Sequence, residues 1–247
     1  MATTAIPRLR LFAGPNGSGK SALLDELRGQ FNLGVYVNAD EIEKQLVRQR
    51  FLHLSDYKLA ATQADFAAFL AGGKTAVGAQ TSQEIGLHVA ENIVVMQPEA
   101  AVNSYVAATV ADFLRHQLLA ARLSFTFESV MSHRSKLEFL QLAAATGYRT
   151  YLYYIATETP AVNVDRVSNR VSNRVSKGGH GVSTEKIVSR YAKSLGLLVE
   201  TMQQVSRAYL FDNSGASIWW FAEYEPGKLT TIGQEIPEWF RRTWMGS

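Results

Sequence analysis

The residues best suited to chemistry lie near the start of the chain, in a loop rich in glycine. Residues 12–24 read FAGPNGSGKSALL, and they fill the pattern G-x-x-x-x-G-K-S/T with Gly14, Gly19, Lys20 and Ser21. The backbone N–H groups of such a loop surround nucleotide phosphates, the lysine reaches the β- and γ-phosphates, and the hydroxyl binds Mg²⁺. The alternative is a chance glycine-rich turn. We expect nucleotide to bind at Gly14, Pro15, Asn16, Gly17, Ser18, Gly19, Lys20, Ser21 and Ala22.

Two carboxylates follow predicted strands on the side where this loop would lie. Asp40 comes after a short strand over residues 35–38, and Glu128 ends a strand over residues 123–129. A kinase uses a carboxylate to accept the proton of the acceptor hydroxyl, and we expect Asp40 to be this base. The alternative is that Asp40 caps the helix that follows it. Glu128 could bind Mg²⁺ or, with Ser129, the substrate; alternatively it bonds a neighbouring loop.

A repeated arginine motif follows in the second half of the chain. The segment DRVSNRVSNRVSKGGHG repeats R-V-S-N every four residues, which places Arg166, Arg170 and Arg174 along one side of a helix. Like charges at this spacing repel, so the pattern makes sense if a polyanion neutralises them. Three glycines then break the helix, and Ser183 is expected to cap a new one. We predict a lid over residues 162–183 whose arginines contact the transferring phosphoryl group; the alternative is a solvated basic face.

These residues need elements that bring them together. Strands are predicted at residues 9–13, 35–38, 123–129, 150–157, 208–214 and 217–225, the last of them antiparallel at one edge. Their alternation with helices predicts an α/β fold, with a parallel sheet of about five strands and helices on both faces. Ligands bind at the carboxyl ends of such strands. Asp212 and Asn213 are expected to form a turn after one of these strands.

The stretch between the second and third strands is predicted to be mostly helical. Apolar residues recur at helical spacing from residue 41 to about 122, although residues 72–99 are less regular. We therefore expect a helical insertion around residues 48–101. No linker rich in proline, glycine or serine is present, so residues 1–247 are expected to form a single domain.

Composition limits the classes of protein. The chain has 247 residues, no cysteine and a formal net charge of +3. It has no apolar run near 18 residues and no secretory signal pattern, so we expect no membrane partner and a cytoplasmic protein. The weak positive charge suits an anionic ligand, and we do not expect nucleic acid as partner. The L-S-G-G-Q signature of transporter ATPases and the N-K-x-D motif of GTPases are absent, which leaves small-molecule kinases as the leading class.

Taken together, the motifs resemble those of the zeta-toxin-like P-loop kinases. The similar segments are FAGPNGSGKS, YVNADEI, FTFESVMS and NRVSKGGHGV…RYAKSL…AYLFDNS, within residues 9–40 and about 103–214. The resemblance implies a kinase that uses ATP or GTP with Mg²⁺, phosphorylates the 3′-hydroxyl of UDP-N-acetylglucosamine, and acts as a toxin with an antitoxin protein as partner. It carries nucleotide and metal binding onto Lys20 and Ser21, the catalytic base onto Asp40, substrate or metal binding onto Glu128, and phosphate contacts onto Arg170, Arg174 and Arg190.

Two departures from that pattern leave alternatives open. The R-V-S-N block has one unit more than expected, and the stretch over residues 48–101 is longer where substrate selection takes place. The acceptor could therefore be another phosphate-bearing metabolite with a free hydroxyl. The alternatives are a nucleoside, polynucleotide or dinucleotide kinase on the same fold, and an NTPase that acts as a nucleotide-gated switch.

Overall fold

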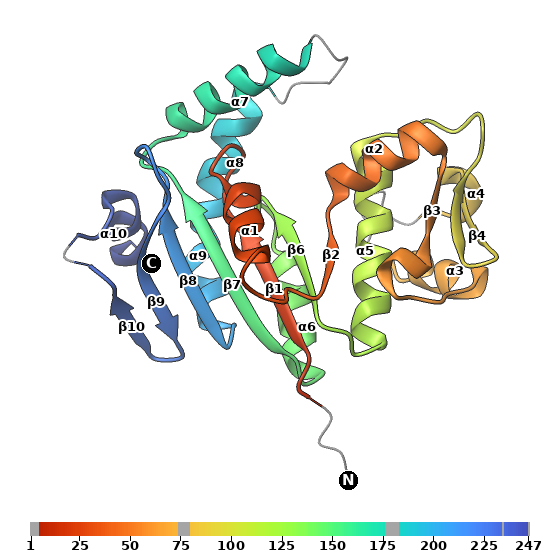
Figure 1. The fold of residues 1–247 in the computed structure, drawn as a ribbon, viewed down its shortest axis with the longest axis horizontal. Helices are drawn as coiled ribbons and strands as arrows, with labels where there is room; N and C mark the ends of the chain where they lie inside the picture. The colour runs from red at the N-terminus through yellow and green to blue at the C-terminus, as the bar shows by residue number, and fades with distance from the viewer. Residues whose placement is uncertain (1–4, 74–79, 176–182, 234, 247) are drawn as a thin grey trace. The chain divides into compact units, whose positions relative to one another are not determined.

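The computed structural model describes residues 5–73, 80–175, 183–233 and 235–246, except for the side chains of residues 170–175. The chain divides into two compact units: residues 1–33 with 126–247, and residues 34–125 (Figure 1). The expectation that residues 1–247 form a single domain stays a prediction.

The first unit contains a mostly parallel sheet flanked by helices. Its elements are β1 (Arg8–Ala13), α1 (Lys20–Arg28), β6 (Phe125–Ser129), α6 (Ser135–Ala145), β7 (Arg149–Ala156), α7 (Pro160–Val175), α8 (Thr184–Gly196), α9 (Leu198–Gln203), β8 (Arg207–Asp212), β9 (Trp219–Glu225), β10 (Lys228–Thr231) and α10 (Glu238–Met245). The strands lie side by side in the order β10-β9-β8-β7-β1-β6. Strand β7 is parallel to β1 on one side and to β8 on the other.

The far end of this sheet differs from the prediction in one respect. Strand β9 pairs antiparallel with β8, as expected for residues 217–225. It is not the edge strand, because β10 pairs antiparallel with it through a turn at Gly227 (φ +80°). The sequence did not predict β10 because this strand has only four residues, and their largely exposed side chains show no clear apolar pattern.

Apolar side chains cover both faces of the parallel strands. In β1 every residue after Arg8 is buried, and Leu11 lies opposite Leu152 of β7. Figure 1 shows α1 in front of these strands and α6, α8 and α9 behind them. The prediction of a parallel sheet with helices on both faces is confirmed. The carboxyl ends of β1, β7 and β8 therefore lie together at one end of the sheet, where the phosphate loop begins.

The second unit combines helices with a small antiparallel sheet. Its elements are β2 (Val35–Val37), α2 (Ala39–Gln49), β3 (Phe51–His53), a 3₁₀ helix η1 (Leu54–Tyr57), α3 (Gln63–Ala71), α4 (Ser82–Ile85), β4 (Leu87–Ala90), β5 (Ile93–Met96) and α5 (Ser104–Ala120). The helices agree with the expected helical character, but strands in the order β3-β5-β4 were not expected.

A tight hairpin explains these unexpected strands. Glu91 and Asn92 connect β4 to β5, and both have positive φ, +50° and +63°. Positive φ at both central residues is typical of the two-residue hairpin turn. Asn92 also accepts a hydrogen bond from the N–H of Ala61 (3.1 Å) and donates one to the carbonyl of Leu59 (3.1 Å). The asparagine between two short β-branched runs was the available signal for this hairpin.

Aromatic packing forms the core of the second unit. The rings of Phe66 on α3 and Phe113 on α5 lie 5.0 Å apart, edge to face, and both side chains are fully buried. Phe69 of α3 also packs against Phe113 and His116 of α5. Among the described residues of the whole chain, no helix is both long enough and apolar enough to span a bilayer.

Candidate phosphate-binding site

Three glycines give the phosphate loop (residues 14–21) its path at the end of β1. Gly14, Gly17 and Gly19 all have positive φ, at +141°, +77° and +103°. A Cβ on Gly14 would lie 1.9 Å from the carbonyl oxygen of Ile155 on β7, and one on Gly19 would lie 2.4 Å from Nδ2 of Asn213. Real Cβ atoms do not approach this closely, so the loop needs glycine at both positions.

Lys20 folds back over the phosphate loop. Its Nζ donates hydrogen bonds to the carbonyl oxygens of Gly14 (2.8 Å) and Pro15 (2.9 Å). Lys20 is also the first residue of α1, whose N-cap, Gly19, offers no side-chain cap, and the first turn of α1 has no acidic residue. An ammonium group beside uncapped N–H groups at a helix N-terminus favours an anion such as a phosphate.

Ser21 and Glu128 place two oxygen ligands beside this helix terminus. The hydroxyl of Ser21 donates a hydrogen bond to Oε2 of Glu128 at 2.9 Å, although the two residues are 107 positions apart in the sequence. Mg²⁺ prefers oxygen ligands and uses one or two carboxylates together with phosphates and waters, so this pair fits the ion. Among the described residues no group of three or more His, Asp or Glu forms a metal site.

Two asparagine amides, of buried Asn163 and half-buried Asn213, hold the outer side of the phosphate loop. Nδ2 of Asn163 donates to the carbonyl of Asn16 (2.6 Å), and Nδ2 of Asn213 donates to the carbonyl of Ser18 (2.8 Å). In a planar trans peptide the C=O and the following N–H point in opposite directions. The N–H groups of Gly17 and Gly19 therefore point away from the asparagine amides, toward the inside of the loop.

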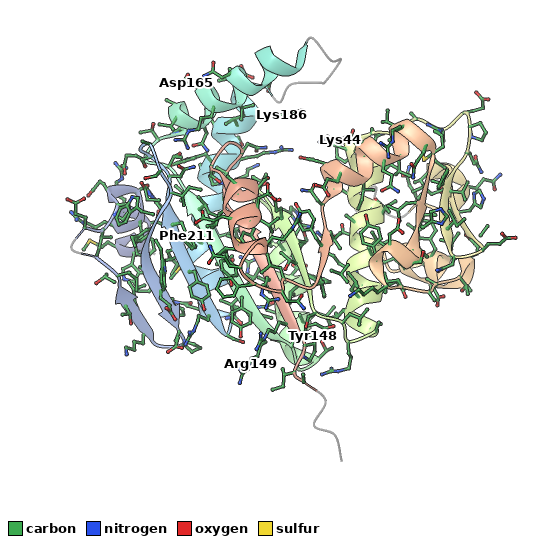
Figure 2. The ribbon with its side chains drawn as sticks, viewed as in Figure 1. Lys44, Tyr148, Arg149, Asp165, Lys186 and Phe211 are labelled. Atoms are coloured by element: carbon green, nitrogen blue, oxygen red, sulfur yellow. The ribbon has the colours of Figure 1, made fainter. Side chains whose placement is uncertain are left out.

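Sequence reasoning missed both of these amides as site residues. Asn163 lies in the first turn of α7, and Asn213 follows β8; Figure 2 labels Asp165 and Phe211 on the same two segments. Asn163 is fully buried, and its Oδ1 accepts a hydrogen bond from the hydroxyl of Thr157. The only signal in the sequence was an asparagine near the end of each of two predicted strands: Asn213 within residues 208–214, and Asn163 six residues after the strand over residues 150–157.

Two polar atoms of the phosphate loop have no protein partner among the described residues. These are the buried Oγ of Ser18 and Oδ1 of Asn16. Ser18 is fully buried, at 0% exposure. Buried polar atoms in proteins are almost always hydrogen-bonded to protein or to a bound molecule. Such atoms in a phosphate loop are consistent with a loop that binds a ligand.

The first half of α7 is attached to this site. Nη1 of Arg166 donates to the carbonyl of Asn213 (2.7 Å), and its Nη2 donates to the carbonyl of Gly215 (3.2 Å). The guanidinium group of Arg166, the first arginine of the R-V-S-N repeat, is thus bound to backbone carbonyls. The lid was predicted to begin at residue 162, but Asn163 and Arg166 bind the helix start to the loops beneath it.

The remaining lid residues stay predictions. Helix α7 extends through Arg170 and Arg174, as the R-V-S-N repeat predicted, but both side chains lie outside the described part. Residues 176–182, with the three glycines, also lie outside it. Ser183 caps α8 as expected, accepting from the N–H of Lys186. Arg190 on α8 is half-buried, and its side chain makes no hydrogen bond or ion pair within the described residues.

Ser129 takes part in a local turn. Its Oγ accepts a hydrogen bond from the N–H of Met131 (3.0 Å), a residue with φ of +54°. Such a bond is typical of serine in turns. Its role in substrate binding stays a prediction.

Asp40 belongs to the second unit and is not a helix cap. The N-cap of α2 is Asn38, whose Oδ1 accepts hydrogen bonds from the N–H groups of Asp40 (2.8 Å) and Glu41 (3.3 Å). The capping alternative for Asp40 is therefore wrong, because the residue two positions earlier already satisfies these donors. The carboxyl of Asp40 is exposed in the first turn, and its role as catalytic base stays a prediction.

Comparison with known proteins identifies the fold. The sequence matches no protein-family model and no curated protein. A chain from the PezAT chromosomal toxin–antitoxin system of Streptococcus pneumoniae has 14% sequence identity and a TM-score of 0.56, over 99% of this chain and 80% of that chain. An AvrRxo1-ORF1:AvrRxo1-ORF2 structure with sulphate ions has 14% identity and a TM-score of 0.53, and a structure of that complex with ATP has 14% and 0.50. Both AvrRxo1 matches cover 92% of this chain and 61% of that chain, so this chain spans less than two thirds of their length.

At 14% identity these similarities establish the fold. The chain has an α/β fold with a mostly parallel sheet and a phosphate loop between β1 and α1. It shares this fold with a chain of the PezAT system and with a chain of the AvrRxo1 complex.

Proposed function

We propose that this protein is an ATP- and Mg²⁺-dependent kinase that transfers the γ-phosphoryl group to a hydroxyl of a phosphate-bearing small metabolite. The observation that carries the proposal is the phosphate loop, with Lys20 across its opening and the Ser21–Glu128 pair beside the N-terminus of α1. The motif resemblance to zeta-toxin-like kinases supports UDP-N-acetylglucosamine as the first acceptor to test. GTP is the alternative phosphoryl donor.

Nucleotide binding uses the polar groups of the phosphate loop. The N–H groups of Gly17 and Gly19 point inward and donate to phosphate oxygens, while the ammonium group of Lys20 neutralises their charge. Ser21 and Glu128 would hold a Mg²⁺ ion, which would supply positive charge beside the phosphates. The AvrRxo1 structure with the same fold that was determined with ATP supports a nucleotide at this loop.

Phosphoryl transfer requires an activated hydroxyl and stabilisation of charge. The acceptor oxygen forms a bond to the γ-phosphorus while the bond to the β–γ bridging oxygen breaks, and Asp40 accepts the hydroxyl proton. Arg170 and Arg174 on the lid, with Arg190 on α8, contact the phosphates. Their charge stabilises the transferring group, and lid closure excludes water that would otherwise hydrolyse ATP.

We also propose that the protein is a toxin that is held inactive by an antitoxin protein. The PezAT chain comes from a toxin–antitoxin system, and the AvrRxo1 match is one member of a two-protein complex. A kinase that consumes a nucleotide sugar would deprive the cell of a cytoplasmic precursor, so the proposed place of action is the cytoplasm.

A labelling experiment tests this function. Purified protein is incubated with γ-³²P-ATP, Mg²⁺ and one acceptor at a time: UDP-N-acetylglucosamine, NAD, nucleosides or short oligonucleotides. Asp40→Ala and Lys20→Ala proteins are run beside it. Label on one acceptor that disappears in both variants supports a hydroxyl kinase and identifies its substrate class. Label released only as free phosphate, whichever acceptor is present, would instead favour the NTPase switch.

A further inference from the structure

A buried carboxylate outside the phosphate loop has four hydrogen-bond donors. Asp212 ends β8, one residue after Phe211 (Figure 2), and is 4% exposed. Its Oδ1 accepts from Nε1 of Trp239 (2.8 Å) and from the hydroxyl of Ser214 (2.6 Å). Its Oδ2 accepts from Nε1 of Trp219 (3.1 Å) and from the N–H of Ser214 (3.0 Å). Each carboxyl oxygen therefore has two partners.

These partners come from three separate segments. Trp219 begins β9, Trp239 lies in α10, and Ser214 lies in the turn that follows β8. Among the described residues, no lysine, arginine or histidine forms an ion pair with Asp212. A buried carboxylate without a cation is costly, and hydrogen bonds to it must offset the loss of water. Asp212 has no part in the proposed phosphoryl transfer, so its burial and its four hydrogen bonds need another explanation.

The next residue connects this carboxylate to the phosphate loop. The N–H of Asn213 donates to the carbonyl of Ala156 at the end of β7 (2.8 Å), and its Nδ2 donates to the carbonyl of Ser18 (2.8 Å). Its own carbonyl accepts from Arg166 of α7 (2.7 Å). Asn213 thus joins the ends of two parallel strands, the lid helix and the phosphate loop. Asp212 directly precedes Asn213, and its carboxylate accepts from the N–H of Ser214, the residue that directly follows Asn213.

We infer that Asp212 is a positioning residue for nucleotide binding. Held by Trp219 and Trp239, it fixes the turn in which Asn213 binds the carbonyl of Ser18. This contact keeps the phosphate loop in its phosphate-binding form before nucleotide arrives, which lowers the cost of ordering the loop on binding. The C-terminal helix α10 therefore controls nucleotide affinity through one indole N–H. The inference rests on the proposed function, because the ligand is the nucleotide of that same loop.

A pair of neighbouring substitutions in α10 separates positioning from packing. Trp239→Phe removes the indole N–H and keeps an aromatic ring, whereas Phe240→Leu changes the next residue, which has no bond to Asp212. Both side chains are buried to 1% exposure and both pack on Phe221. The two variants are therefore expected to lose stability alike, which a thermal unfolding curve without ligand would verify.

Affinity for AMP-PNP with Mg²⁺, measured by calorimetry, is the first readout. We expect Trp239→Phe to raise the Kd about three- to tenfold, since only part of the effect of losing a hydrogen bond to a charged group reaches the phosphate loop. Phe240→Leu should change the Kd by less than about twofold, since it leaves the Asp212 network intact. Equal changes in the two variants would overturn the inference.

A double-mutant cycle tests the route through Asn213. Asp212→Asn keeps the shape of the side chain but loses acceptor capacity, and Asn213→Ala removes the amide that binds the carbonyl of Ser18. If Asp212 acts through Asn213, the double variant should have nearly the Kd of Asn213→Ala alone. Fully additive effects would show that Asp212 acts on affinity independently of Asn213 and would contradict the inference.

Hydrogen exchange distinguishes failure of this inference from failure of the kinase proposal. Faster exchange of the amides of residues 14–21 in Trp239→Phe, and not in Phe240→Leu, is expected whether or not nucleotide is bound. If the wild-type protein transfers no phosphate, the kinase proposal fails while the exchange and Kd measurements still decide the role of Asp212. Unchanged exchange in Trp239→Phe would overturn the inference.

Discussion

Individual side chains in the phosphate loop make the strongest case for nucleotide chemistry. Lys20 bonds to two loop carbonyls, and Ser21 bonds to Glu128 beside the first turn of α1. Two buried polar atoms of the loop, on Asn16 and Ser18, have no partner among the described residues. A loop with donors inside, a cation across it and oxygen ligands at its edge fits a phosphate chain with Mg²⁺.

Substitution of Gly14 tests the close approach of the phosphate loop to β7. In Gly14→Ala the new Cβ would meet the carbonyl of Ile155 at a φ of +141°, so the loop must move. We expect nucleotide affinity to fall at least about tenfold, together with loss of about 1–3 kcal/mol in the free energy of unfolding. Calorimetry and urea unfolding measure the two effects.

Gly233 provides the matched control for this substitution. A Cβ there would meet nothing within 4 Å, and its φ is not in the positive region. Gly233→Ala should therefore leave both affinity and stability nearly unchanged. A Gly14→Ala protein that binds nucleotide like the wild type would contradict the loop geometry.

The Ser21–Glu128 pair is expected to set the requirement for Mg²⁺. Ser21→Ala and Glu128→Gln should each raise the Mg²⁺ concentration needed for half-maximal activity about tenfold, because each weakens one ligand of the ion. Their effects should not add, since the two groups act on one ion. Initial rates over a Mg²⁺ series measure this change, with Glu138→Gln on the exposed face of α6 as control. Variants with an unchanged Mg²⁺ requirement would place the metal elsewhere.

At the scale of elements, α7 combines an anchored start with the predicted lid. Asn163 and Arg166 bind its first turns to the phosphate loop and to the turn after β8. The R-V-S-N repeat therefore contains arginines with different roles. Arg166 belongs to the repeat by its position in the sequence, but its guanidinium group donates hydrogen bonds to backbone carbonyls. Within the R-V-S-N repeat, Arg170 and Arg174 remain the predicted contacts of the transferring phosphoryl group.

Kinetics should separate the anchor from the lid. Arg166→Lys keeps the charge but cannot reach two carbonyls in the same geometry, and we expect kcat/KM to fall only about two- to tenfold. Arg174→Ala should lower kcat by about a hundredfold or more, as for loss of an arginine that stabilises transition-state charge. Steady-state rates, measured with the acceptor that the labelling experiment identifies, test both expectations. An effect of Arg174→Ala confined to KM would argue against a role in the transition state.

At the scale of the whole molecule, stability at alkaline pH reflects buried tyrosines. Burial, followed by the nearby charge of Glu158, raises the pKa of Tyr191 to about 12, and its hydroxyl donates to the carbonyl of Thr157 (2.6 Å). The unfolded chain releases this proton near pH 10, whereas the folded chain keeps it until about pH 12. The unfolded state then binds fewer protons than the folded state, so stability falls as pH rises through this window.

Replacement of Tyr191 tests this pH dependence. Tyr191→Phe should lower the free energy of unfolding at pH 8, because the variant lacks the hydrogen bond to Thr157. Between pH 10 and pH 12, however, the free energy of unfolding of the variant should decrease less steeply than that of the wild type. One titrating group contributes a slope of at most about 1.4 kcal/mol per pH unit. Urea unfolding at several pH values measures it. Identical slopes would show that Tyr191 does not titrate with folding.

The sequence by itself determined the local features of this protein. Glycine spacing specified the phosphate loop between a strand and a helix, and apolar periodicity predicted β1, β7, β8, the helices around them and the cap at Ser183. These signals are readable because they depend on residues a few positions apart, through backbone dihedral angles and the two side-chain periods. The same local signals left open the alternative that Asp40 caps α2, and this alternative was wrong because Asn38 occupies the N-cap position.

Only the tertiary structure decided which distant groups support the site. Asn163 and Asn16 are 147 positions apart, and Asn213 and Ser18 are 195 positions apart, so no local pattern connects them. The role of Asp212 likewise depends on indole donors brought by β9 and α10. The strands β3, β4 and β5 and the edge strand β10 were missed because short strands are stabilised by their partners across the sheet. Hydrogen bonds between buried polar groups form only when folding removes their water, so a linear sequence does not reveal them.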